Sequence, residues 1–193
     1  MKNIFTNSTI PEKYNIQKPY TQKTYLINGE LKEWKGETAS VFSPIYQKKR
    51  EGELEQVLLG TIPNLSEKEA LASLESACNA YDKGRGIWPT MKVEERISCI
   101  ENFAEMMLET RDEVVNWLMW EIGKPYEESC NEFDRTIDYI NDTISNLREM
   151  DQKHSEIKNH NGILAQVRRA PLGVVLCLSP YNYPLNETFC LLI

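Results

Sequence analysis

Short runs in which apolar and polar positions alternate fill the first third of the chain, and they predict β-strands. The runs cover residues 24–27, 30–34, 39–45 and 57–62. Asn28-Gly29 separates the first two runs, and both residues tolerate the positive φ angles that a tight hairpin turn needs. Residues 1–23 are polar without a clear period and predict an extended arm, whereas the charged run 47–55 predicts a solvated loop.

The middle of the chain changes to the three- and four-residue spacing of amphipathic helices. Ser/Thr-x-x-Glu sequences begin at Ser66, Thr110 and Ser129. This spacing is that of a capping box, in which a hydroxyl and a carboxylate satisfy backbone N–H groups at the start of a helix. Glycines at 84 and 123 are expected to end helices. The predicted helices run from 66 to about 81, through 97–107, from 110 to 122 and from 129 to about 150.

The last part of the chain is expected to be rich in strands. A polar loop is predicted over 151–162 and a strand over 163–169. The apolar run 173–180, bounded by glycine and Ser-Pro, is typical of a strand covered on both faces in a parallel sheet between helices. A single strand cannot form a parallel sheet, so the strands that pair with it must come from outside this segment. The pattern as a whole predicts an α/β protein.

Composition narrows the function classes. The 193 residues include 29 acidic and 22 basic side chains, for a net charge of −7. This acidic balance argues against nucleic acid as a partner, because phosphate backbones need a basic patch. No apolar stretch of about 18 residues predicts a membrane span, and the first residues lack the apolar core of a secretory signal. Five widely spaced cysteines without a CxxC pair favour reduced thiols, so we expect a cytoplasmic protein.

Metal chemistry is not predicted. Asp134, Asp138 and Asp142 repeat every fourth residue and share one helix face, but nothing nearby supplies further ligands, so a solvated face is favoured. The two histidines, His154 and His160, are six residues apart, which is outside the usual spacing of metal ligands on a helix.

One segment near the end of the chain combines rigidity with a polar side chain. Pro180 and Pro184 flank Asn182 just past the predicted strand. Ligands of open α/β sheets gather at the carboxyl ends of strands, and an amide held there can donate a hydrogen bond to a developing oxyanion. Taken alone, the residues favour a turn in which Asn182 caps the following helix, and catalysis is the alternative.

The same segment carries a family resemblance. RRAPLGVV at 168–175 followed by SPYNYP at 179–184 resembles the aldehyde dehydrogenase superfamily, as do EIGKP at 121–125 and YLINGELKEW at 25–34. The resemblance extends from about residue 24 to the last residue. With it, a catalytic role of Asn182 is favoured over a helix cap. The resemblance implies the N-terminal part of that fold: a β-hairpin arm, a helical middle and the first strand of an incomplete doubly wound sheet.

The resemblance also implies a division of the chain into four parts. The hairpin and helices belong to the family's cofactor domain, and the parallel sheet of the nucleotide-binding domain begins near the end of this chain. The four expected parts are an arm (1–23), the hairpin and helices (24–150), a strand arm for oligomerisation (151–170) and the truncated start of the nucleotide-binding sheet (171–193).

The implied reaction is NAD(P)-dependent oxidation of an aldehyde to the acid. In the family a cysteine thiolate attacks the aldehyde, a hydride passes to NAD(P), and a glutamate-activated water releases the acid. Asn182 matches the family's oxyanion asparagine, and Ser179 and Tyr181 lie in the stretch that approaches the nicotinamide nucleotide. The Asn-Tyr-Pro form is most similar to non-phosphorylating NADP-dependent glyceraldehyde-3-phosphate dehydrogenases. Arg135 matches their phosphate-binding arginine, and Tyr183 falls in the substrate site.

Alternatives remain at several of these positions. Arg135 is equally well explained as a surface arginine on an acidic helix, although a guanidinium fork suits phosphate. Cys177 and Cys190 are expected to pack as small hydrophobes, because neither lies in the family's nucleophile context. The matching cysteine and general-base glutamate occur downstream in the family, whereas this chain ends eleven residues after Asn182.

We therefore expect a truncated aldehyde dehydrogenase whose isolated chain is inactive. A non-catalytic module for self-association or interaction is the alternative. The uncovered strands 163–169 and 174–178 predict association with a second copy or with a full-length relative. The expected small-molecule partner of the complete family is an aldehyde.

Overall fold

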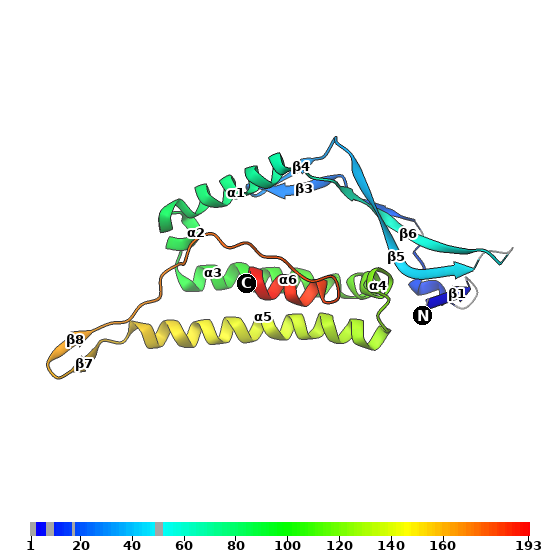
Figure 1. The fold of residues 1–193 in the computed structure, drawn as a ribbon. Helices are drawn as coiled ribbons and strands as arrows, with labels where there is room; N and C mark the ends of the chain where they lie inside the picture. The colour runs from blue at the N-terminus through cyan, green and yellow to red at the C-terminus, as the bar shows by residue number, and fades with distance from the viewer. Residues whose placement is uncertain (1–2, 7–9, 17, 49–51) are drawn as a thin grey trace. The chain divides into compact units, whose positions relative to one another are not determined.

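The computed structural model describes residues 3–6, 10–16, 18–48 and 52–193. The chain forms two compact units, and Figure 1 shows their elements. The first unit comprises Met1–Ser76 and Asp112–Asn131, and the second comprises Ala77–Arg111 and Glu132–Ile193. Each unit is described by itself.

A four-stranded sheet in the order β1-β5-β6-β2 forms the first unit's framework. Its strands are β1 (Asn3–Thr6), β5 (Thr38–Lys48), β6 (Leu54–Pro63) and β2 (Tyr20–Thr21). The central strands β5 and β6 pair antiparallel, and β1 and β2 add to the two edges in parallel. The predicted strands at 39–45 and 57–62 are confirmed and longer than expected. The predicted loop is correspondingly shorter, and its residues 49–51 lie outside the described residues.

Two local features explain how this sheet accommodates its sequence. Gly60 of β6 faces the backbone of β2 so closely that a Cβ would lie 1.9 Å from the Tyr20 carbonyl oxygen, so only glycine permits this pairing. Pro44 lies within β5 where the register shifts between Phe42 and Tyr46. A proline is tolerated there because the pairing is irregular at this position and needs no backbone N–H from it.

The predicted Asn-Gly hairpin is confirmed. Strand β3 (Thr24–Ile27) pairs antiparallel with β4 (Glu30–Glu33). Both turn residues have positive φ, 55° at Asn28 and 74° at Gly29, as a type I′ turn requires.

Helix α4 (Arg111–Ile122) completes the core of the first unit from residue 112 onward. Trp120 is buried, and its indole Nε1 donates a hydrogen bond to the Tyr14 carbonyl at 2.6 Å. The buried hydroxyl of Ser43 on β5 donates to the Trp120 carbonyl. These bonds fasten the helix both to the sheet and to the N-terminal arm. The helix ends as predicted at Gly123, whose φ is 77°.

The second unit is built mainly of helices. Helix α1 (Glu67–Tyr81) begins in the first unit and ends in the second, followed by the short turn Asp82–Gly84. The further helices are α2 (Ile87–Thr90), α3 (Val93–Glu109), α5 (Tyr126–Ser155, from Glu132 in this unit) and α6 (Pro184–Leu192). The apolar core residues of α3 and α5 are Ile97, Ala104, Met107, Phe133, Ile137, Ile140 and Ile144.

Only one of the three predicted capping boxes closes at its expected helix. At α1, the Ser66 backbone N–H donates to the Glu69 carboxylate at 3.0 Å, and the Lys68 N–H donates to the Ser66 hydroxyl at 3.3 Å. Thr110 instead donates its hydroxyl back to the Met107 carbonyl at 2.8 Å, at the end of α3.

The prediction that Ser129 starts a helix is wrong. Helix α5 begins at Tyr126, and the Ser129 hydroxyl donates to the Pro125 carbonyl at 3.1 Å from within the first turn. The preceding Pro125 sets a helical φ and lacks an N–H, which favours the earlier start. Glu127 and Glu128 in the first turn stabilise the positive end of the helix dipole.

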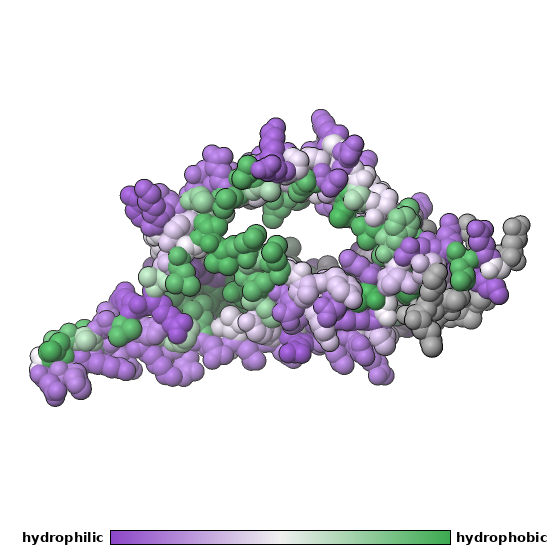
Figure 2. Space-filling view, viewed as in Figure 1, coloured by the Kyte–Doolittle hydropathy of each residue, from purple (hydrophilic) through white to green (hydrophobic). Residues whose placement is uncertain are grey.

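The segment after α5 departs from the sequence prediction in two ways. Helix α5 continues to Ser155, and the expected loop contains a strand, β7 (Lys158–His160), that pairs with β8 (Ile163–Ala165). Asn161-Gly162 turns this hairpin with φ angles of 52° and 85°. The strand predicted over 163–169 is thus confirmed only in its first three residues. Figure 2 shows hydrophobic residues on the hairpin, where Ile163 and Leu164 are exposed.

The buried strand predicted over 173–180 does not form. The segment forms no strand, and its residues Leu176 (80% exposed) and Leu178 (75%) are accessible to solvent. A strand needs neighbours for its backbone hydrogen bonds, and no strand lies beside this segment in the described part of the chain. In the described residues no helix is both long and apolar enough to cross a membrane.

Candidate functional site

The start of α6 is held by a side chain from α5. Glu132 is buried, 3% exposed, and its carboxylate oxygen Oε1 accepts the backbone N–H of Leu185 at 3.1 Å and that of Asn186 at 3.4 Å. A helix N-terminus carries unsatisfied N–H groups and partial positive charge, so a carboxylate is its natural partner. Glu132 therefore ties the beginning of α6 to the N-terminal part of α5.

Local sequence explains why α6 needs this distant partner. Its first residue is Pro184, which has no N–H, and the preceding Tyr183 provides no side-chain cap. The next two N–H groups are the ones that Glu132 takes. The tertiary bond replaces the local cap that Ser, Thr, Asp or Asn would supply.

A small polar cluster extends this anchor into the core. Asn186 is buried, and its Nδ2 donates to the Thr136 hydroxyl at 3.4 Å. The Thr136 hydroxyl in turn donates to the Glu132 backbone carbonyl at 2.7 Å. Farther along α6, the rings of Phe103 and Phe189 lie 5.1 Å apart. Helix α6 is thus fixed at its start by polar contacts and along its length by packing.

The five residues predicted for the site lie on the two segments that the Glu132 contacts join. Ser179, Tyr181, Asn182 and Tyr183 lie in the segment that leads into α6, and all four are exposed. Arg135 lies on α5 three residues after Glu132 and is also exposed. Its positive charge lowers the pKa of the Cys190 thiol on α6, against the larger effect of burial, which raises it. The fold therefore places Arg135 close to α6, the helix that the motif segment enters.

The side chain of Asn182 is available to a ligand. Within the described residues no group bonds its amide, and the residue is exposed two positions before α6 begins. Its role as a helix cap, the alternative at the level of sequence, is not realised, because Glu132 takes the N–H groups that an asparagine cap would serve.

Neither nearby cysteine is prepared as a nucleophile. Burial and the neighbouring Glu187 raise the pKa of Cys190, whose thiol donates to the Asn186 side-chain oxygen at 3.7 Å. The Cys177 thiol donates to the Leu191 carbonyl at 3.3 Å. A reactive cysteine needs a lowered pKa, so the raised pKa of Cys190 fits a packing role.

Sequence reasoning missed Glu132 as a member of the site. It was assigned to a capping box within its own helix, whereas its carboxylate points to α6. The signal was present in the pattern, because Ser129, Glu132, Phe133 and Thr136 share the buried face of α5. An acidic residue on an otherwise apolar stripe requires a buried hydrogen-bonding partner, which here is the end of another helix.

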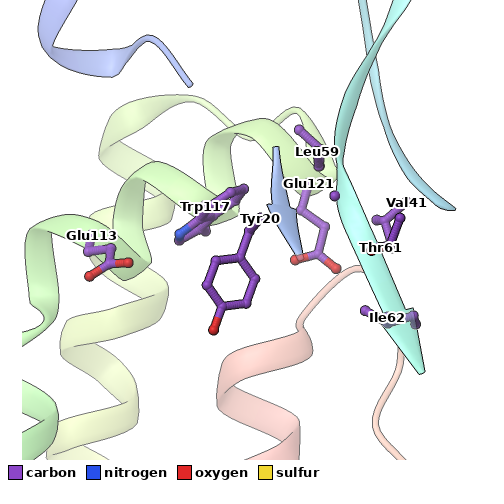
Figure 3. Close-up of a pocket in the computed structure, with 9 residues that line it drawn as sticks. Tyr20, Val41, Leu59, Thr61, Ile62, Glu113, Trp117 and Glu121 are labelled. Carbon is purple, nitrogen blue, oxygen red and sulfur yellow. The ribbon is translucent and has the colours of Figure 1, made fainter. Parts of the chain in front are cut away.

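A second concave feature lies within the first unit. A cavity of about 330 Å³ is bounded by β2, β6 and α4. Figure 3 shows the rings of Tyr20 and Trp117 beside it, and their centroids are 6.5 Å apart. Glu113 and Glu121 stand one helical turn on either side of Trp117. None of the predicted site residues lines this cavity. Among the described residues no group of three His, Cys, Asp or Glu side chains is arranged to hold a metal ion.

The fold is that of the aldehyde dehydrogenases. A solved structure of NADP-dependent glyceraldehyde-3-phosphate dehydrogenase from Bacillus halodurans, complexed with NADP, superimposes with a TM-score of 0.69 and 29% identity. The match covers 88% of this chain and 34% of that one. It confirms the predicted fold class.

The chain belongs to the aldehyde dehydrogenase family, whose model matches residues 49–190. Lactaldehyde dehydrogenase of Methanococcus maripaludis is 28% identical over 128 residues, covering 65% of this chain and 27% of the relative. NADP-dependent glyceraldehyde-3-phosphate dehydrogenase of Streptococcus equinus is 28% identical over 135 residues, covering 66% and 27%. The chain thus spans about a quarter to a third of the length of these relatives, and the resemblance noted in its motifs is confirmed.

Proposed function

We propose that this chain supplies the oxyanion-binding and substrate-binding part of an NAD(P)-dependent aldehyde dehydrogenase that oxidises glyceraldehyde 3-phosphate to the acid. The anchoring of α6 by Glu132 is the observation that carries the proposal. It ties the helix that follows the family motif to the helix that carries Arg135. Membership of the family supports the reaction class, and two relatives named for glyceraldehyde 3-phosphate support the substrate.

Asn182 is the proposed oxyanion donor. When a nucleophile adds to an aldehyde, negative charge develops on the carbonyl oxygen, and a fixed amide N–H stabilises that charge. One such donor is worth about 100- to 1,000-fold in rate. The exposed amide of Asn182, free of partners in the described part of the chain, supports this assignment.

Arg135 is the proposed phosphate ligand, with Tyr183 lining the substrate site between Arg135 and Asn182. The Arg135 guanidinium makes no ion pair with the described residues. By contrast, Arg111 at the start of α4 forms two 2.7 Å bonds with Asp134, the residue next to Arg135 on α5. A planar guanidinium fork matches two phosphate oxygens at once. An unpaired arginine beside the motif helix is therefore suited to a phosphorylated aldehyde.

Ser179 and Tyr181 are the proposed contacts to the nicotinamide nucleotide, NADP or alternatively NAD. The Tyr181 ring is 85% exposed, and the Ser179 hydroxyl has no partner among the described residues. An open ring face and a free hydroxyl fit a nucleotide that stacks and forms hydrogen bonds. The bound nucleotide would accept the hydride.

We propose that the 193-residue chain by itself does not oxidise aldehydes. The reason is that no residue here matches the family's nucleophilic cysteine or general-base glutamate, and the two thiols near the motif segment, Cys177 and Cys190, donate hydrogen bonds to acceptors on α6. A second candidate function, self-association or assembly with a full-length relative, is supported by the exposed leucines of 172–178 and by the hairpin residues Ile163 and Leu164. Light scattering across protein concentration tests this candidate: a growing particle mass supports it, and a constant monomer mass contradicts it.

Substrate recognition is tested by NMR titration of the isotope-labelled chain. Glyceraldehyde 3-phosphate is expected to shift the side-chain amide of Asn182 with an affinity at least about tenfold higher than glyceraldehyde, because charge-assisted hydrogen bonds to phosphate are the strong ones. Arg135→Gln should remove the difference. Arg85→Gln is the matched control, since Arg85 is an exposed arginine of the same unit paired with Asp82 at 3.1 Å. Equal affinity for the two aldehydes would contradict the proposal.

A further inference from the structure

A cavity of about 310 Å³ lies at the C-terminal end of α5, within the second unit. It is formed by the start of α3, the last turns of α5 and the segment after the β7–β8 hairpin. Its lining consists of Val93, Arg96, Leu147, Met150, Asp151, His154, Ser155, Arg168 and Arg169.

The cavity is strongly basic. Three arginines from two separate segments line it, against the single carboxylate of Asp151. None of the three guanidinium groups forms an ion pair or hydrogen bond within the described part of the chain. Elsewhere in this unit the arginines at 85, 111 and 148 each bond a carboxylate. Of the four arginines of this unit that have no ion pair among the described residues, three line this cavity, and the fourth is Arg135.

Arg96 gives the most specific indication of a ligand. Its Nε is buried and has no hydrogen-bond partner among the described residues. Buried donors on charged groups are costly to leave unsatisfied, so native structures rarely do so. The atom belongs to a side chain that lines the cavity, and an anion there would satisfy it.

The chain just before Arg168 and Arg169 is hydrogen-bonded to the end of α5. The Gln166 side-chain Nε2 donates to the Ser155 carbonyl at 3.0 Å. This bond satisfies a carbonyl at the end of α5 and holds the segment that carries the two arginines against that helix end. The lining also includes three apolar side chains, Val93, Leu147 and Met150.

We propose that this cavity binds a phosphate monoester. Three guanidinium groups less one carboxylate leave a formal charge of about +2, which matches a phosphate dianion, and guanidinium forks suit its oxygens. A phosphate group fills only part of the space, and the apolar lining residues are suited to the carbon portion of the ester. Arg135 is 16 residues before Asp151 on the same helix, a distance of about 24 Å, so this site is separate from the proposed substrate site.

The test is an NMR titration of the chain with glycerol 3-phosphate, inorganic phosphate and succinate. The signals to follow are the Arg96 side-chain Nε–H and the amides of Arg168 and Arg169. Saturable shifts with glycerol 3-phosphate are expected at concentrations below about 10 mM, as for metabolite-binding sites of modest affinity. Inorganic phosphate should bind more weakly because it lacks the apolar part, and succinate more weakly still.

Variants separate binding from folding. Arg96→Gln is expected to weaken glycerol 3-phosphate binding at least about tenfold, since it removes charge-assisted bonds. The double variant Arg168→Gln/Arg169→Gln changes only exposed residues, so it tests the site even if Arg96→Gln fails to fold. Arg85→Gln is the matched control and should bind as the unmodified chain does.

Three results would overturn the proposal. They are the absence of saturable shifts, equal affinity for all three anions, and unchanged binding in both arginine variants. The signals of Asn182 report the proposed substrate site independently, so failure at one site is distinguishable from failure at the other.

Discussion

Removing the carboxylate of Glu132 is expected to release the start of α6. Glu132→Ala deletes the acceptor of two backbone N–H groups, at 3.1 and 3.4 Å, from a position that is 3% exposed. A hydrogen bond to a charged group contributes about 1.5–3 kcal/mol, and the longer bond contributes less. The helix dipole adds about 0.3–1 kcal/mol. Relief of the buried charge offsets part of this sum, so we expect a loss of about 2–4 kcal/mol.

Glu132→Gln separates the contribution of the negative charge from that of the hydrogen bonds. The glutamine keeps an oxygen that accepts both N–H groups but loses the negative charge, so its expected loss is smaller, about 1–2 kcal/mol. Asp138→Ala is the matched control, because Asp138 is an exposed acidic residue on the same helix. Surface substitutions of this kind change the free energy of unfolding by less than about 0.5 kcal/mol.

Two assays measure the effect. Urea unfolding gives the free energy of unfolding for each variant. Hydrogen exchange of the Leu185 and Asn186 amides reports the helix start directly, and in Glu132→Ala it should be faster by about 30- to 1,000-fold, the equivalent of 2–4 kcal/mol. If Glu132→Ala were as stable as Asp138→Ala and left both amides equally protected, the anchoring of α6 would be refuted.

Three further predictions concern other contacts. The Arg111 guanidinium lowers the pKa of Asp134 below its ordinary value of 3.8. This pair therefore stabilises the fold above that pH, and the contribution is lost as pH falls through the lowered pKa. Asp134→Asn should reduce the loss of unfolding free energy on acidification, measured in urea, by about 0.5–1 kcal/mol, the amount for a half-exposed pair, and an unchanged pH dependence would contradict this. Cys190, whose thiol pKa burial raises, should be alkylated by iodoacetamide more slowly than exposed Cys78, as read by mass spectrometry, and equal rates would contradict its packing role. Gly60→Ala should destabilise the sheet by about 1–3 kcal/mol in urea, because the new Cβ meets a carbonyl oxygen of β2 at 1.9 Å, and full retention of stability would contradict this pairing.

Local signals in the sequence predicted much of the fold. The Asn28-Gly29 turn and the box at Ser66 depend on neighbours within a few residues, and both appear as expected. The same turn chemistry at Asn161-Gly162 does not predict a hairpin by itself, because the residues before the turn, 158–160, are polar and do not alternate. The two strands that pair there are only three residues long each, which is too short for an alternating pattern to be recognised.

What could not be predicted depends on tertiary partners. The carboxylate of Glu132 bonds a residue 53 positions away, and no local pattern distinguishes that bond from a cap within its own helix. The run 173–180 has the composition of a buried strand, but the ladder it would join is not formed by the described residues. The roles of Asn182, Arg135, Tyr183, Ser179 and Tyr181 stay predictions, although the fold brings the motif helix α6 and Arg135 together.

The measurement that tests the central claim most directly follows Asn182 and Arg135 in one titration. The chain is titrated with glyceraldehyde 3-phosphate while NMR records the Asn182 side-chain amide and the Arg135 Nε–H. If the two residues form one site for a phosphorylated aldehyde, both signals shift along a single binding curve with the same Kd. A response of only one signal, or two curves with different midpoints, would contradict the account.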